Sequence, residues 1–70
     1  MNSLTLEQAS LLNEYILAYK MLNITNDFKL YDALQNRLIA ISRRFGFEDN
    51  TSQLTIFNFC NDTLETNNIT

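Results

Sequence analysis

Residues 5–46 have the sequence TLEQASLLNEYILAYKMLNITNDFKLYDALQNRLIAISRRFG, in which two long amphipathic stretches are separated by a short polar break. Within each stretch, apolar residues recur at the three- and four-residue spacing of an α-helix. The 70-residue chain has no proline and one glycine, a composition that favours helices over a turn-rich β fold. The sequence therefore predicts an all-α protein built on an antiparallel helical hairpin, with helices over about 5–22 and 27–44.

The first helix is expected to begin at Thr5, because Thr5 and Gln8 have the spacing of a capping box and Glu7 suits the first turn. Leu17 and Met21 fall on the polar half of this helix, and since they are four residues apart they should contact each other. The apolar half holds Ala9, Leu11, Leu12, Tyr15, Ile16, Ala18, Tyr19 and Leu22.

The connection over 23–26 is short enough to make the two helices antiparallel neighbours. Either Thr25 or Asn26 is expected to cap the second helix, with Asp27 in its first turn.

The second helix is predicted to end in a Schellman motif, with Gly46 as its C′ residue and Phe47 making the apolar contact that follows. Its apolar half holds Phe28, Leu30, Tyr31, Leu34, Leu38, Ile39, Ile41 and Phe45.

The segment 53–65 permits two interpretations. Its aromatic and β-branched residues at 54–60 have strand propensity, but a strand here would have no sister strand in the chain. A helix capped by Thr51 or Ser52 separates the polar side chains from an apolar side that holds Ile56, Phe57, Phe59, Cys60 and Leu64. We therefore favour a third helix over a strand.

A chain of this length forms one domain at most, so we expect a single domain over 1–65 and frayed polar residues at 66–70. One cysteine and no histidine exclude an internal disulfide and an ordinary zinc site. No glycine-rich loop or nucleophile–base pair is present. We expect no enzymatic activity, no cofactor and no metal.

The first residues, MNSLT, lack the positive and apolar regions of a signal peptide, and no apolar stretch approaches the ~20 residues that span a bilayer. A free cysteine also fits a reducing cytosol. We expect a cytoplasmic protein without membrane contact, and the many Asn and Ile residues suggest an AT-rich genome of bacterial or phage origin.

Both predicted hairpin helices are apolar over about half their circumference, more than the roughly 100° stripe that one neighbour covers. A third helix, a second copy of the hairpin or a different protein could cover the excess, so a homo-oligomer is one expectation. Leu17 and Met21 on the polar half, with Ile24 at the turn, fit a protein-interaction patch. The alternative is that the third helix or a dimer partner covers them.

Four of the five basic residues lie on the outer face or at the end of the second helix: Lys29, Arg37, Arg43 and Arg44. They form a candidate stripe for a phosphate backbone or an acidic protein surface. The alternative is an ordinary solvated helix face, and the net charge of −3 argues against binding nucleic acid over the whole surface.

The residues Leu11-Leu12-x-Glu14, Leu22-Asn23-Ile24-x-x-Asp27-Phe28 and Ile41-x-Arg43-Arg44-x-Gly46 resemble the Sda family of sporulation-checkpoint inhibitors. The resemblance implies a helical hairpin that binds the dimerisation and phosphotransfer region of a histidine kinase. By position, it places the apolar contacts on Ile24 and Phe28. A fainter similarity to the Rop hairpin, in Leu30-x-Asp32 and Arg44-Phe45-Gly46, implies an RNA-binding dimer.

Together these features predict a small non-enzymatic regulatory protein that binds and inhibits or adapts a protein partner. The predicted contacts are the apolar residues Leu17, Met21, Ile24 and Phe28. The alternative function is a nucleic-acid-binding helical-hairpin homodimer that uses the basic stripe of the second helix.

Overall fold

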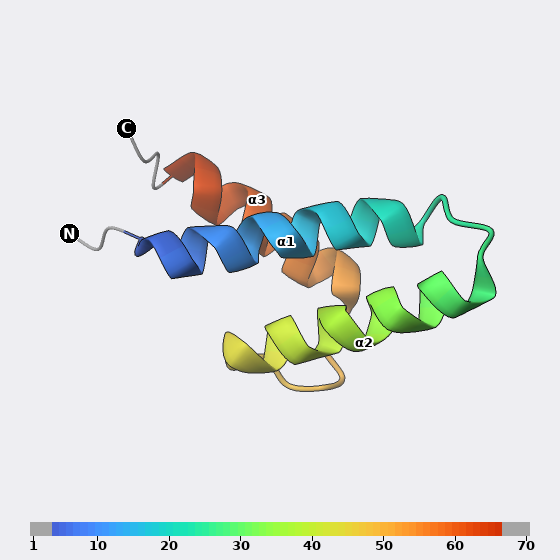
Figure 1. Ribbon diagram of the computed structural model, residues 1–70. Helices are drawn as coiled ribbons and strands as arrows, with labels where there is room; N and C mark the ends of the chain where they lie inside the picture. The colour runs from blue at the N-terminus through green and yellow to red at the C-terminus, as the bar shows by residue number, and fades with distance from the viewer. Residues whose placement is uncertain (1–3, 67–70) are drawn as a thin grey trace.

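The computed structural model describes residues 4–66, which form three α-helices and no strand. These are α1 (Leu6–Leu22), α2 (Phe28–Arg44) and α3 (Gln53–Thr66) (Figure 1). The all-α hairpin and the choice of helix over strand for the third element are thus confirmed. Residues 67–70, most of the expected frayed tail, lie outside the described residues, and Thr66 still belongs to α3.

The start of α1 is fixed by the capping box that the sequence predicted. The Thr5 side-chain oxygen accepts a hydrogen bond from the Gln8 backbone N–H at 3.0 Å, and Gln8 Oε1 accepts one from the Thr5 N–H at 3.0 Å. Two backbone donors that a helix leaves unpaired at its start are therefore satisfied locally.

The cap of α2 differs from the expectation. Asp27, not Thr25 or Asn26, is the N-cap, and its Oδ1 accepts from the N–H groups of Lys29 at 3.0 Å and Leu30 at 3.2 Å. Thr25 instead accepts from the Asp27 N–H at 3.1 Å and so supports the capping residue. A carboxylate at the cap is favoured over a hydroxyl because it also complements the positive end of the helix dipole.

The end of α2 is the predicted Schellman motif. The Phe47 N–H donates to the Ser42 carbonyl and the Gly46 N–H to the Arg43 carbonyl, both at 3.0 Å. Gly46 has a φ of 86°, the left-handed region where a residue without Cβ is preferred.

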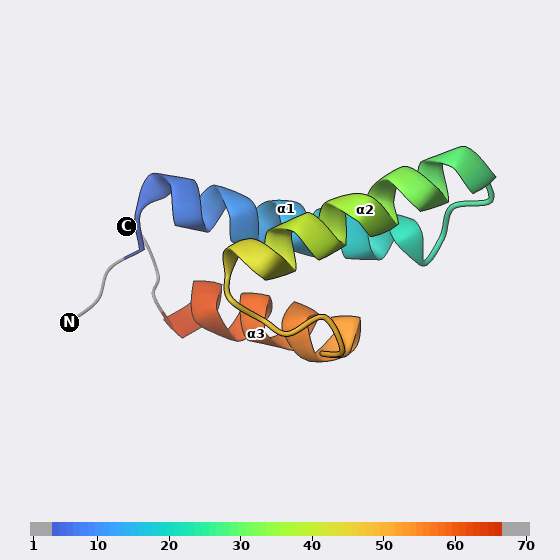
Figure 2. The same cartoon turned by 90° about the horizontal axis from the view of Figure 1, so that it is seen from below.

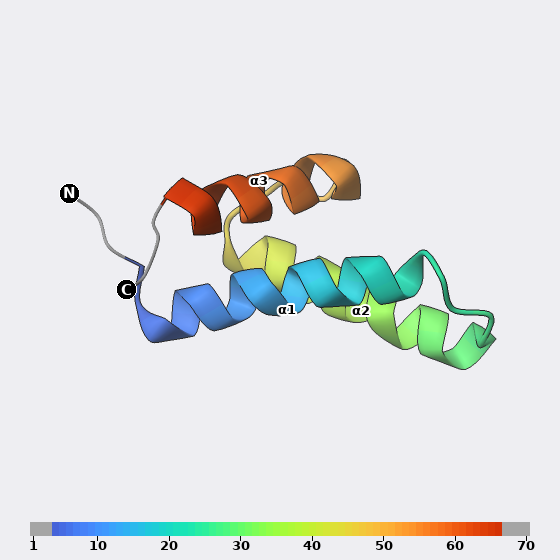
Figure 3. The ribbon, with the colours of Figure 1, turned by 90° about the horizontal axis from the view of Figure 1, so that it is seen from above.

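The central helix is α1, which packs against both α2 and α3. Both neighbours run antiparallel to it, and α3 lies on one side of the hairpin (Figures 2 and 3). Side chains from all three helices form one core: Leu12, Tyr15, Ile16, Ala18, Leu22, Leu38, Ile41, Ile56 and Cys60. The third helix therefore supplies much of the cover that the wide apolar faces require.

Aromatic contacts attach α3 to the rest of the molecule. Tyr19 of α1 stacks on Phe57 of α3 with ring centroids 4.7 Å apart. The rings of Phe45 and Phe47, which follow α2, make T-shaped contacts with the ring of Phe59 in α3. The ring centroids are 6.3 Å apart for Phe45 and 5.2 Å apart for Phe47. These contacts join α3 both to the last turn of α1 and to the end of α2.

Part of the predicted apolar half of α2 is exposed, which corrects the sequence expectation. Leu38 and Ile41 are buried, whereas Phe28, Leu30, Tyr31 and Ile39 are exposed. For Phe28, Leu30 and Tyr31, in the first turns of α2, the reason is visible in all three views, where the hairpin turn projects beyond the first residues of α3 (Figures 1–3). No element of the described chain lies against the first turns of α2 on that side.

Candidate functional site

An open cavity of about 690 Å³ follows the surface of α1 beside α2. Three exposed apolar side chains of α1 line it, namely Leu6, Leu17 and Met21, together with Leu34 of α2. The polar lining comes from Ser10, Asn13, Glu14 and Arg37. We call this cavity the α1 groove.

Leu17 and Met21 lie where the sequence placed them, on the side of α1 away from the core. Leu17 is 62% exposed and Met21 is 45% exposed. One interpretation was that the third helix covers these residues, and this is wrong, because α3 packs on a different side of α1. An interaction patch and cover by a second copy remain as the alternatives.

Ile24 lies in the turn and Phe28 is the first residue of α2, and their exposed fractions are 79% and 78%. Neither lines the α1 groove, so the structure does not gather all four predicted contact residues into one cavity. The turn itself is ordered by backbone bonds, in which the N–H groups of Ile24 and Thr25 donate to the Met21 carbonyl at 3.1 and 2.9 Å. Exposed apolar side chains thus occur both along α1 and at the turn.

Leu6 and Leu34 are groove residues that the sequence reasoning missed. Leu6, at 87% exposure, was not assigned to any face. Its spacing of eleven residues from Leu17 is about three helical turns, so the helical period alone could have placed both on one side of α1. The sequence analysis placed Leu34 on the apolar half of the second helix. In the structure its side chain is partly buried against the core and also lines the groove.

Three of the four basic residues predicted as a stripe are engaged by carboxylates. Arg37 forms an ion pair with Glu14 across the α1–α2 contact, with Nη2 donating to Oε1 at 2.8 Å. Arg44 reaches Glu7 at 3.0 Å. Both pairs bring residues of α1 and α2 together that are far apart in the sequence.

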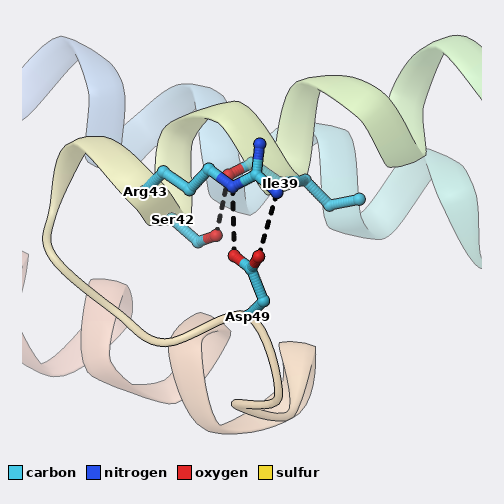
Figure 4. Close-up of polar contacts among 4 residues, drawn as sticks. All are labelled: Ile39, Ser42, Arg43 and Asp49. Carbon is cyan, nitrogen blue, oxygen red and sulfur yellow. Dashed lines mark hydrogen bonds and ion pairs between the residues drawn. The ribbon is translucent and has the colours of Figure 1, made fainter.

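Arg43 forms a two-bond ion pair with Asp49, with distances of 3.0 and 2.9 Å (Figure 4). Hydrogen bonding from the guanidinium lowers the pKa of Asp49, as the bond from Arg37 lowers the pKa of Glu14. Within residues 4–66, Lys29 alone of the stripe makes no ion pair. The stripe is therefore largely neutralised within the chain.

Cys60 is fully buried in the core, and this burial raises the pKa of its thiol to about 11. The thiol stays protonated at neutral pH and packs as a small apolar side chain.

The chain matches no protein-family model, no curated protein and no solved structure. The similarity of the hairpin to the Sda family therefore stays a prediction from its residues. In the part of the chain that the structure describes, no helix combines the length and apolar character needed to cross a membrane.

Proposed function

We propose that this protein is a small cytoplasmic regulator that binds a protein partner through an apolar surface of its helical hairpin. Binding inhibits or adapts the partner, and the regulator itself catalyses no reaction. The surface, here called the hairpin patch, consists of Leu17, Met21, Ile24 and Phe28. One observation carries the proposal: these residues are exposed in a molecule whose three helices already share a core.

The exposure has a physical implication for binding. A single exposed apolar residue is ordinary, but several along one helix and its turn offer apolar area that association with another protein would remove from water. Each square ångström of apolar area buried contributes roughly 25 cal/mol to association before its entropic cost. Aromatic side chains such as that of Phe28 are enriched at the centres of such interfaces.

The electrostatics of the α1 groove also suit an apolar partner. Its two charged lining residues, Glu14 and Arg37, form a pair with each other. A partner that covers the groove would not have to supply a counter-charge, although desolvation of the pair would offset part of the gain.

The resemblance to Sda-type inhibitors points in the same direction. The positions that it marks for partner contact, Ile24 and Phe28, are among the most exposed apolar residues of the described chain. A histidine kinase is therefore the first partner class to test.

The nucleic-acid alternative has less support, because a phosphate backbone would have to displace carboxylates from Arg37, Arg43 and Arg44. Charge reversal at Lys29, Arg37 and Arg44 tests it. Binding that collapses with both added salt and charge reversal would favour this alternative over the proposed one.

The experiment for the proposed function compares two double variants of the tagged protein. Leu17→Glu with Met21→Lys alters the hairpin patch, and Leu54→Glu with Asn58→Lys makes matched charge changes four residues apart on the exposed face of α3. Proteins captured from a lysate of the native host are identified by mass spectrometry for each. We expect a partner that the wild type and the α3 variant capture and the patch variant loses.

Two outcomes would overturn or redirect the proposal. A folded patch variant that captures the same partner as wild type would place the interface elsewhere. Sedimentation velocity at micromolar concentration addresses self-association: a dimer that only the patch variant loses would assign the patch to a second copy of the chain.

A further inference from the structure

The α1 groove has the residue spacing of a surface on which a second α-helix packs. Its lining residues on α1 run from Leu6 to Met21 in alternating steps of three residues and one residue. Residues spaced in this way lie on one continuous face of a helix. From Leu6 to Met21 this face extends over about 22 Å, or about four helical turns. A helix of similar length would lie along it from end to end.

The face divides into hollows of the kind that receive side chains of a packed helix. Such a hollow is formed by four residues at positions i, i+3, i+4 and i+7 of one helix. At the start of the groove, Leu6, Ala9, Ser10 and Asn13 have this spacing. Leu6 provides an exposed apolar wall, and Ala9 contributes only a methyl group, which leaves room for an incoming side chain.

The hollow at the other end of the groove has the same construction. It is formed by Glu14, Leu17, Ala18 and Met21. Leu17 and Met21 are its exposed apolar walls, and Ala18 again contributes only a methyl group. Both end hollows therefore suit an apolar side chain of a second helix.

The middle hollow is more polar than the two end hollows. It is formed by Ser10, Asn13, Glu14 and Leu17. Glu14 is paired with Arg37, but the side chains of Ser10 and Asn13 have no hydrogen-bond partner within residues 4–66. Polar groups that become buried need such partners. A hydrogen-bonding side chain of the occupant would therefore fit this hollow better than an apolar one.

Lys20 supplies the charge that distinguishes between occupants. It immediately precedes the last residue of the groove, is exposed and makes no ion pair with any residue in the range 4–66. The two carboxylates of α1, on Glu7 and Glu14, are already paired with arginines of α2. A second copy packed through α1 would therefore have no free carboxylate on this helix for Lys20, whereas a different helix with an acidic residue would complement it.

From the three hollows and the charge of Lys20, we propose that the α1 groove receives one amphipathic α-helix of the protein partner. This helix places apolar side chains in the two end hollows, a hydrogen-bonding side chain in the middle hollow and a carboxylate beside Lys20. The inference rests on the proposed function and deepens it. It extends the contact surface from Leu17 and Met21 to the first turns of α1.

The test is a titration of the ¹⁵N-labelled full-length protein with a side-chain-stapled helical peptide of about 18 residues, which is about 27 Å long. One face of the peptide carries leucines three and four residues apart around a central glutamine. A glutamate flanks each end of this face, so that either direction of binding brings one to Lys20. The amides of Ser10, Asn13 and Leu17 should shift. A peptide of the same composition with its leucines distributed around the helix should bind about tenfold more weakly or worse.

Two protein variants locate the binding and its charge preference. Ser10→Glu places an unpaired charge in two of the three hollows and should weaken peptide binding by about tenfold or more. Asn58→Glu adds the same charge on the exposed face of α3 and should change binding by less than about twofold. Lysines in place of the peptide's glutamates should weaken binding to the wild type by about two- to fivefold, the effect of one exposed ion pair. Lys20→Glu should reverse this preference, and a preference that does not reverse would contradict the assignment of a carboxylate to this position.

Equal binding of the two leucine arrangements, an unchanged affinity of the Ser10→Glu variant, or shifts confined to Ile24 and Phe28 would overturn the inference. So would shifts of the groove amides that depend on protein concentration without peptide, because a second copy would then fill the groove. The proposed function is judged separately, by capture from the lysate. A partner that is lost with Leu17→Glu plus Met21→Lys but retained by Ser10→Glu would refute the groove and leave the proposed function standing.

Discussion

Truncation of Leu38 should cost a large part of the stability of this protein. Leu38 is 1% exposed and belongs to the core that α1, α2 and α3 share. Leu→Ala changes at such positions destabilise by about 2.7–5.0 kcal/mol, through lost burial and the cavity that remains. A core in a chain of this size rarely supplies more than about 3–5 kcal/mol in total, so Leu38→Ala should be at or near the unfolding threshold at 25 °C.

The same chemical change at Leu17 provides the control, because Leu17 also lies within a helix but is 62% exposed. We expect Leu17→Ala to change the free energy of unfolding by no more than about 0.5 kcal/mol. In a domain of this size, 1 kcal/mol shifts the thermal midpoint by about 4–8 °C. Leu38→Ala should therefore lower the midpoint by well over 10 °C, and Leu17→Ala by less than 4 °C.

Urea and thermal unfolding followed by circular dichroism at several protein concentrations measure both variants. A loss at Leu17 as large as that at Leu38, at every concentration, would refute the packing described here, because it would place Leu17 in the core. A loss at Leu17 that grows with protein concentration would show instead that a second copy covers this residue.

Three further predictions concern single sites. Gly46→Ala should lower the thermal midpoint by about 4–8 °C, because a φ of 86° costs an L-residue about 1 kcal/mol. An added Cβ meets no atom within 4 Å, so steric contact should add nothing to this cost. An unchanged midpoint would contradict the left-handed conformation. The hydrogen bond from Arg37 lowers the pKa of Glu14, so the pair stabilises fully above the ordinary glutamate value of 4.5 and loses its effect as the pH falls through the lowered pKa of the folded state. Glu14→Gln should accordingly flatten the acid side of the pH–stability curve slightly, and a curve unchanged in shape would indicate that the pair is not formed in solution. Cys60 should react with iodoacetamide at about pH 8 far more slowly in the native protein than in urea, because its thiol is buried and its pKa is raised to about 11; equal rates would show that α3 does not hold its packed position.

The sequence was most informative where the deciding interactions are local. The start of α1 and the end of α2 depend on hydrogen bonds between residues three to five apart, and Thr5, Gln8 and Gly46 make them as predicted. The cap of α2 was misplaced by one or two residues, because Thr25, Asn26 and Asp27 are all competent caps. Only the geometry of the turn selects Asp27 among them.

Burial on α2 could not be predicted in the same way. Helical periodicity assigns Phe28, Tyr31 and Leu38 to one apolar half, but it does not say what lies opposite each of them. α3 has 14 residues against 17 in α2, about 21 Å against about 25 Å, and it lies toward the end of the hairpin away from the turn. Leu38 is covered as a result, and Phe28 is not.

The ion pairs were equally inaccessible from the sequence. Glu14 and Arg37 are 23 residues apart, and Glu7 and Arg44 are 37 apart, so their pairing depends on the register of α1 against α2. Once that register is known, the two pairs prove to be neighbours along one antiparallel contact. Three of the four basic residues predicted as a stripe, Arg37, Arg43 and Arg44, are therefore paired with carboxylates of the same chain.

The position of α3 accounts for the separation between the core and the hairpin patch. α3 covers only the part of the hairpin away from the turn, and although the core cluster extends to Leu22 at the end of α1, Ile24 in the turn and Phe28 at the start of α2 lie outside it. The turn is held by its own backbone hydrogen bonds and by the Asp27 cap, which do not require those two side chains. Substitutions of Ile24 and Phe28 should therefore cost little stability. The separation matters for the proposed binding role, since a core this small leaves almost no surplus stability to lose.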